Sequence, residues 1–293
     1  MGGKGDESVK WIVSGEGVEE VDARIPVRDR GALFGDGLFE TFRVERGIPL
    51  FLEEHLDRLI RSAKTLRFAR VPGEDELKGA IREAIRLNGV GSGYLRLTLT
   101  RGDGGYGIPL DRLDRPRYWV EAGEQRLDPG RYEQGIPAVV SFPARNPASP
   151  ISGHKTLHFL ESLLAKDDAE KKGAREAILR TMEGDLSEGA SSNLFLVTRG
   201  TIRTPGLDRA PLPGVARAWT IRTARRLKLP LEETRLETAE LWKAEEVFFT
   251  NSTWGPFPCR EIDGCPVGDG TPGPVTRRLI RAWREDIDRQ TRR

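Results

Sequence analysis

The sequence has few of the residues that build disulfide frameworks and metal sites. Its 293 residues include two cysteines and three histidines. Cys259 and Cys265 are too few for a disulfide framework, and without nearby histidines they make no zinc site. His154 and His158 have the spacing of a zinc helix, but a lysine stands where a zincin needs glutamate, and only His55 remains as a third imidazole. We therefore expect no metal ion.

Strong net charge and long apolar runs are also absent. The 47 basic and 45 acidic residues leave a net charge of +2, which is too small to indicate a nucleic-acid or membrane partner. No apolar run approaches a membrane span, and the first ten residues lack the apolar core of a secretion signal. The "RGDGGYG" loop and the basic tail raise the alternative of a binding module, but the loop is not repeated and the tail carries acids. We expect an ordinary globular protein of the cytoplasm.

The hydrophobic pattern predicts an α+β protein with two domains. With 37% hydrophobic residues, a chain of this length can bury a sizeable core. Strand-like runs and hairpin signals alternate with amphipathic helical stripes. Over 122–150 proline, glycine and arginine are frequent and the periodicity fades, which predicts a crossing between a smaller N-terminal domain, 1–121, and a larger C-terminal domain, 151–293.

Lys155, in "GHKTLHFLESLLA", is a candidate reactive amine. Ten arginines and no other lysine lie between Lys78 and Lys155, so we would expect arginine here if only a positive charge were needed. Unlike a guanidinium, an amine can lose its proton when desolvated and then act as a nucleophile or form a Schiff base. A lone lysine near a helix start is nevertheless more often a solvated surface group. The run that follows predicts a helix with an apolar face of Leu157, Leu160, Leu163 and Leu164, closed by Gly173.

A Schiff-base lysine suggests pyridoxal phosphate, which also needs an acidic partner for its ring nitrogen and a site for its phosphate. Glu188, at the Ser-Glu-Gly corner of "LSEGASSNLF", is a candidate for the acid. Candidates for the phosphate site are the helix start "PGVAR", the hydroxyls and amides of "TNST", and an arginine beside an apolar stripe. These residues are Arg58, Val215, Ala216, Ser252 and Thr253. Each taken singly is more often an ordinary cap, turn or surface charge.

Eight segments together resemble the class IV aminotransferases. They are "FGDGLFETFR", "FLEEHLDRL", "YLRLTL", "HKTLHFLESLLA", "LSEGASSNLFLV", "LPGVAR", "EVFFTNST" and "GPVTRRL". This family includes branched-chain aminotransferases, D-amino acid aminotransferases and aminodeoxychorismate lyases, and the resemblance runs from about Arg28 to Trp283. It implies a two-domain, fold-type IV pyridoxal phosphate enzyme that forms a homodimer. The implied fold has a small N-terminal α/β domain and a larger C-terminal domain of mixed sheet or barrel and helices.

The resemblance also implies roles for individual residues. Lys155 matches the lysine that forms the Schiff base with the cofactor and moves the substrate's α proton, and Glu188 matches the carboxylate that pairs with the ring nitrogen. The phosphate site matches Arg58, Val215, Ala216 and Ser252. The substrate pocket matches Phe34, Phe39, Arg96 and Thr253, with Arg96 matching an arginine that helps hold the substrate carboxylate.

The family's chemistry leaves two reactions open. We expect a transaminase that moves an amino group between an amino acid and a 2-keto acid. The alternative is an aminodeoxychorismate lyase, which shares the cofactor site but expels pyruvate and leaves 4-aminobenzoate. The arginine-histidine pair of many D-amino acid enzymes is not evident in "RGDGGYGIP", although Arg101 lies in this loop. His158 and Phe159 stand where the family commonly has Asn-Tyr, and Ala216 stands where it often has threonine.

Overall fold

The computed structural model describes residues 10–104 and 106–292, with the side chains of 142–144 left aside. The chain forms two compact units. The first holds the described residues up to Arg126 together with Lys155–His158, and the second holds Leu127–His154 and the residues from Phe159 onward. The chain therefore passes from the first unit to the second more than once, and the short Lys155 segment belongs with the N-terminal residues.

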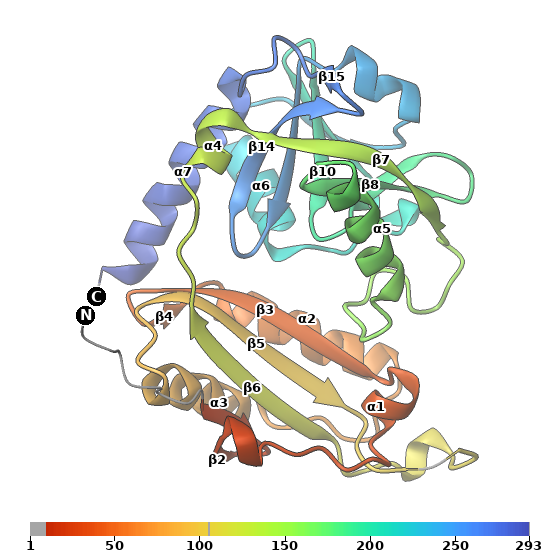
Figure 1. Ribbon diagram of the computed structural model, residues 1–293, viewed down its shortest axis with the longest axis vertical. Helices are drawn as coiled ribbons and strands as arrows, with labels where there is room; N and C mark the ends of the chain where they lie inside the picture. The colour runs from red at the N-terminus through yellow and green to blue at the C-terminus, as the bar shows by residue number, and fades with distance from the viewer. Residues whose placement is uncertain (1–9, 105, 293) are drawn as a thin grey trace. The chain divides into compact units, whose positions relative to one another are not determined.

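The first unit is an antiparallel sheet of six strands in the order β2-β1-β6-β5-β3-β4, covered on one face by helices (Figure 1). Its strands are β1 (Lys10–Val13), β2 (Glu16–Glu19), β3 (Gly37–Glu45), β4 (Ile48–Pro49), β5 (Ser92–Thr100) and β6 (Arg117–Glu124), and its helices are α1 (Arg30–Phe34), α2 (Leu52–Thr65) and α3 (Glu74–Leu87). Alternate residues of β3 and β5, such as Phe42 and Leu97, pack with Leu59 of α2 in one buried core. By the same alternation, Phe39 and Arg96 lie on the opposite face of the sheet.

The second unit is a mixed sheet of nine strands in the order β12-β11-β10-β13-β14-β7-β8-β9, with β15 paired to β14. Its strands are β7 (Ile136–Arg145), β8 (Glu176–Thr181), β9 (Leu186–Gly189), β10 (Asn193–Thr198), β11 (Thr201–Pro205), β12 (Leu231–Thr234), β13 (Glu246–Asn251), β14 (Gly255–Ile262) and β15 (Cys265–Pro266). Its helices are α4 (Gly130–Gln134), α5 (Leu160–Lys171), α6 (Val215–Arg226) and α7 (Pro274–Thr291). Because β9, at one end of the order, also contacts β10 and β11, the sheet curls into a half-barrel.

Strand β10 shows why the second unit has core on both faces of its sheet. Leu194 and Leu196 belong to one buried cluster, whereas Phe195 and Val197 belong to another. The ring of Phe195 stacks on Phe248 of β13 with the centroids 4.9 Å apart. A strand buried on both faces reads as a continuous apolar run, as "NLFLV" does.

The stretch 122–150, predicted as a crossing between domains, contains regular secondary structure. It contains the end of β6, the short helix α4 and all of β7, which lies between β14 and β8 in the second sheet. Pro137 and Pro143 interrupt the apolar pattern of β7, which hides a strand from pattern analysis. The compact units instead change at Arg126 and Leu127, and the first includes Lys155–His158. The division into domains at 121 and 151 stays a prediction.

The helix predicted after Lys155 presents a different face from the expected one. It begins at Leu160, and its buried residues are small ones, Ser162, Ala165 and Ala169, which lie against β7 and β8. Leu160, Leu163 and Leu164 are instead 66%, 55% and 53% exposed. The predicted apolar face was wrong for these three leucines, because small side chains allow the helix to approach the sheet closely.

None of the helices among residues 10–104 and 106–292 is long and apolar enough to cross a membrane. In the same residues no group of three or more histidine, cysteine, aspartate or glutamate side chains is placed to hold a metal ion. The cytoplasmic location and the absence of a metal stay predictions.

Candidate active site

The backbone of Lys155 is fixed along the edge of β3 in the first unit. The Phe39 amide donates to the Lys155 carbonyl, and the Leu157 amide donates to the Gly37 carbonyl, each at 2.9 Å. A Cβ on Gly37 would lie 2.7 Å from the Leu99 backbone oxygen and 2.6 Å from Leu157 Cδ1, so glycine is favoured where β3 lies between β5 and the Lys155 segment. Strand β4 pairs with β3 only at Val44 and Glu45, at the far end. The Lys155 segment is therefore held by backbone hydrogen bonds to β3, as a neighbouring strand would be.

The side chain of Lys155 lies over an aromatic ring that an arginine also contacts. Its Nζ atom lies 4.3 Å from the centroid of the Phe39 ring, and the guanidinium carbon of Arg96 lies 3.9 Å from the same centroid. Burial lowers the pKa of Arg96 from its ordinary value, and the charge of Glu121 partly offsets this. No hydrogen bond from the Arg96 guanidinium to another described residue is present. An arginine that is partly desolvated and lacks an acceptor is suited to bind a carboxylate.

Arg58 lies on the helix side of β3, where alternation places Glu40. Its Nε donates to Glu40 Oε1 at 2.8 Å and its Nη2 donates to Oε2 at 2.5 Å. His55 Nδ1 is 2.7 Å from the same Oε2. Burial opposes ionisation of Glu40, but the charge of Arg58 and the hydrogen bonds from His55 and Arg58 lower the pKa of Glu40 to about 2. The guanidinium of Arg58 is thus held in one plane by a carboxylate that is charged at neutral pH.

His55 completes this buried group as a neutral donor. Burial lowers the pKa of His55, and the bond to Glu40 only partly opposes the shift. A neutral imidazole that faces a carboxylate carries its proton on the nitrogen of that contact, here Nδ1. The other nitrogen, Nε2, is buried without a hydrogen-bond partner among the described residues. Sequence analysis missed both Glu40 and His55, because their importance depends on contacts between β3 and α2.

The remaining candidate of the first unit, Phe34, is placed differently. It ends the short helix α1, its side chain is 39% exposed, and the guanidinium carbon of Arg30 lies 5.0 Å from the centroid of its ring. The structure therefore brings together Lys155, Phe39 and Arg96, and places Arg58 on the other face of the same sheet.

Glu188 lies in β9 of the second unit, where three donors hold its buried carboxylate. The Leu212 amide donates to Oε2 at 2.9 Å, and Asn193 Nδ2 lies 3.4 Å from the same oxygen. Arg145 Nη2 is 3.2 Å from Oε1. A carboxylate fixed by such donors can face a protonated ring nitrogen. Arg145 ends β7, inside the stretch that sequence analysis took as a crossing, and so it was missed.

The side chain of Asn193 lies close to the start of helix α6. A Cβ on Gly214 would lie 2.0 Å from Asn193 Oδ1, so a larger residue at this helix cap would have to displace the Asn193 side chain. Without a side chain, Gly214 cannot cap the first turn, and Val215 and Ala216 begin the helix with amides that its own cap leaves unused. Amides at a helix start favour an anion such as phosphate.

The turn with Ser252 and Thr253 lies next to the same asparagine. Both residues are half-buried and follow β13. In the pairing of β10 with β13, Asn193 is directly opposite Thr250, whose hydroxyl is buried without a partner in the described chain. Asn193 thus connects Glu188, the start of α6 and the end of β13 within the second unit.

These donor sets fit the parts of pyridoxal phosphate. Within the first unit an amine and a guanidinium lie over one ring. Within the second unit a carboxylate is fixed by donors, and a helix starts at a glycine. Such groups are typical of pyridoxal phosphate enzymes. A sequence model described as "Amino-transferase class IV" matches residues 37–262. The chain belongs to the class IV aminotransferase family.

Relatives of known description resemble the chain over nearly its whole length. A putative branched-chain-amino-acid aminotransferase of Methanocaldococcus jannaschii is 32% identical over 94% of this chain and 96% of its own length. The branched-chain-amino-acid aminotransferase of Escherichia coli is 34% identical over 93% and 91%. A D-alanine aminotransferase of Listeria monocytogenes is 30% identical over 95% and 96%.

Solved structures confirm the fold. The branched-chain amino acid aminotransferase of Escherichia coli matches with a TM-score of 0.89 at 32% identity, over 95% of this chain and 94% of that one. The T.th. branched-chain amino acid aminotransferase with pyridoxamine 5'-phosphate gives 0.87 at 30% identity, over 96% and 94%. A 4-amino-4-deoxychorismate lyase from Pseudomonas aeruginosa gives 0.84 at 32% identity, over 95% and 99%. The predicted α+β fold, aminotransferase class and pyridoxal phosphate cofactor are confirmed, whereas the roles of single residues stay predictions.

Proposed function

We propose that the chain transfers the amino group of branched-chain amino acids to 2-keto acids. The observation that carries this proposal is the approach of the Lys155 amine and the Arg96 guanidinium to one ring, that of Phe39. The α carbon and the carboxylate of an amino acid are joined by one bond, so the base for one and the anchor for the other must lie close together. The descriptions of the Escherichia coli and Methanocaldococcus jannaschii relatives support the branched-chain substrate.

In this proposal each residue has a stated task. When bound, pyridoxal phosphate supplies an electron sink that makes the substrate's α proton acidic. Lys155 binds the cofactor and moves that proton, and Glu188 keeps the ring nitrogen protonated. The phosphate is bound by Arg58, Val215, Ala216 and Ser252, with Ala216 contributing its backbone only. The substrate is bound by Phe34, Phe39, Arg96 and Thr253, with Arg96 on the carboxylate.

Arg101, the arginine of the "RGDGGYGIP" loop, makes its hydrogen bonds within the first unit. Its Nε donates to Asp36 at 2.9 Å, its Nη1 to the Arg67 carbonyl at 2.7 Å and its Nη2 to the Leu66 carbonyl at 2.9 Å. The side chain is buried, so releasing it would leave several polar groups without partners. This supports Arg96 as the anchor and weighs against a D-amino acid site built on Arg101.

An absorbance spectrum of the purified holoenzyme tests this function. Leucine, isoleucine or valine is added alone, in each hand, without a keto acid. We expect one hand of these amino acids to convert the pyridoxal form of the cofactor to the pyridoxamine form, and D-alanine to do so poorly. An unchanged spectrum with every amino acid would overturn the proposal. Release of pyruvate from aminodeoxychorismate in that case would indicate the lyase reaction of the Pseudomonas aeruginosa relative.

We further propose that the chain acts as a homodimer, as the family resemblance implies. Support comes from the leucine patch of α5, Leu160, Leu163 and Leu164, since three exposed leucines on one helix are costly in a monomer. Leu163→Arg with Leu164→Arg should shift the sedimentation coefficient toward a monomer, whereas the control Glu170→Arg on the same helix should not. An unchanged assembly in the double variant would exclude this patch as the interface.

A further inference from the structure

We propose that Arg209 is a positioning residue that aligns the segment 207–214 with strand β9, so that the Leu212 amide reaches Glu188. The inference rests on the proposed role of Glu188 and extends it to a residue that touches neither substrate nor cofactor in the proposal. It is carried by three connections between the same two pieces of chain.

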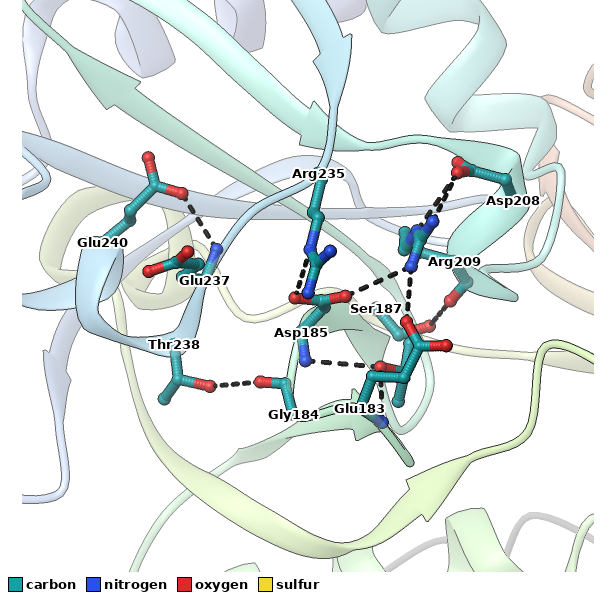
Figure 2. A network of polar contacts seen from close by, with 11 residues as sticks. Glu183, Gly184, Asp185, Ser187, Asp208, Arg209, Arg235, Glu237, Thr238 and Glu240 are labelled. Carbon is teal, nitrogen blue, oxygen red and sulfur yellow. Dashed lines mark hydrogen bonds and ion pairs between the residues drawn. The ribbon is translucent and has the colours of Figure 1, made fainter.

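The first connection is the ion pair at the centre of Figure 2. Arg209 Nη1 donates to Asp185 Oδ2 at 3.2 Å and to Glu183 Oε2 at 2.8 Å. Its Nε and Nη2 donate to Asp208 at 3.1 and 3.0 Å. Asp185 is buried and directly precedes β9. The guanidinium is therefore fixed by three carboxylates, and the buried one belongs to the chain that continues to Glu188.

The second and third connections follow along the same two pieces of chain. The Ser187 hydroxyl donates to the Arg209 carbonyl at 2.7 Å. The Leu212 amide then donates to Glu188 at 2.9 Å. Along β9 and the residue before it, Asp185 and Ser187 both bind Arg209. Glu188, the next residue, binds Leu212. Arg209 makes both connections that precede the one to Glu188.

The backbone between these connections needs support. Ala210 has a φ of +63° and is buried, a conformation that costs a residue with a Cβ about 1 kcal/mol and that persists only where the surroundings impose it. Pro211 and Leu212 follow, and Gly214 then caps α6. A change in the direction of the chain at Ala210 would move both the Leu212 amide and the start of α6.

Arg235 provides a matched comparison, because it binds the other oxygen of the same carboxylate. Its Nε donates to Asp185 Oδ1 at 2.8 Å, as Figure 2 shows. It follows β12 and is not part of the segment 207–214. Loss of Arg235 removes one positive charge from Asp185, as loss of Arg209 does, but leaves the connections to the segment intact.

The test compares Arg209→Gln with Arg235→Gln in the full-length protein, by hydrogen exchange and by the dissociation constant of pyridoxal phosphate. Pro211 and Pro213 have no amide, so exchange over 211–213 reports Leu212 alone. We expect Arg209→Gln to speed this exchange in the cofactor-free protein and to weaken cofactor binding, each about tenfold, whereas Arg235→Gln changes both less than twofold.

Ser187→Ala breaks the second connection independently and should speed Leu212 exchange in the same direction. Arg209→Lys keeps a charge near Asp185 and should recover part of the protection. Equal effects of Arg209→Gln and Arg235→Gln, or faster exchange with unchanged cofactor binding, would overturn the proposal. Failure of the proposed function would show separately, as a wild-type cofactor spectrum that no branched-chain amino acid changes, since neither the exchange comparison nor cofactor binding needs a substrate.

Discussion

The two units hold their charged groups in opposite ways. In the first unit a buried carboxylate, that of Glu40, fixes the guanidinium of Arg58. In the second unit the carboxylate of Glu188 is itself the group that is held, by an amide, an asparagine and an arginine. Fixed partners give each group a direction and a charge before any ligand arrives. The difference shows that Glu40 serves to orient a guanidinium, whereas Glu188 is itself oriented by its neighbours.

The largest expected effect comes from removing the amine of the first unit. Lys155→Ala and Lys155→Arg should both lower turnover by about 10⁴-fold, because the arginine variant keeps the positive charge but cannot act as a base or form a Schiff base. Steady-state assays of both variants check this. Turnover in Lys155→Arg close to that of the wild type would mean that charge alone is needed.

The second unit is tested by neutralising its carboxylate. Glu188→Gln keeps the shape and an acceptor but removes the charge opposite the ring nitrogen, so we expect kcat to fall by about 10²- to 10³-fold with cofactor still bound. The pH dependence of the cofactor's absorbance should shift as well. If kcat and spectrum match the wild type, the fixed carboxylate of the second unit is not the partner of the ring.

The ionisation of Glu40 should affect the stability of the protein rather than the absorbance spectrum of the cofactor. The pKa of Glu40 is lowered from 4.5 to about 2, so its stabilising contribution is complete above about pH 4.5 and is lost as the pH falls toward 2. The loss is roughly 3 kcal/mol for a shift of this size. Urea unfolding between pH 5 and pH 2 should show this loss in the wild type.

Glu40→Gln provides the control for that measurement. It should be less stable at pH 7, because Arg58 is left buried without its partner charge, and its stability should depend less on pH. Parallel pH curves for the two proteins would show that Glu40 does not titrate as described.

A smaller effect should distinguish Arg96 from Arg101. Arg96→Lys keeps the charge but loses the planar donor pair, so kcat/KM for branched-chain substrates should fall about tenfold with little change in Tm. Arg101→Lys should lower Tm and leave KM of the folded protein unchanged, because the hydrogen bonds of Arg101 to described residues are all within its own unit. The reverse pattern would make Arg101 the substrate anchor.

The candidate residues could be found from sequence where one short segment contains the whole signal. Lys155 stands out by its residue type, and Val215 and Ala216 by the Pro-Gly start of their helix. Arg145 and Glu40 could not be found this way. Arg145 ends a strand whose pattern is broken by prolines, and Glu40 acts through residues of another element. The exposed leucines of α5 could not be predicted either. A helical pattern of apolar residues does not show whether its alanines or its leucines face the sheet.

The most direct test of the central claim follows the α proton of the substrate. The holoenzyme is incubated with leucine deuterated at the α carbon, in water and without a keto acid, and loss of the deuterium is followed by NMR. The account predicts rapid loss with the wild type and no loss above background with Lys155→Ala. Loss at the wild-type rate in Lys155→Ala would contradict the claim that the Lys155 amine moves this proton.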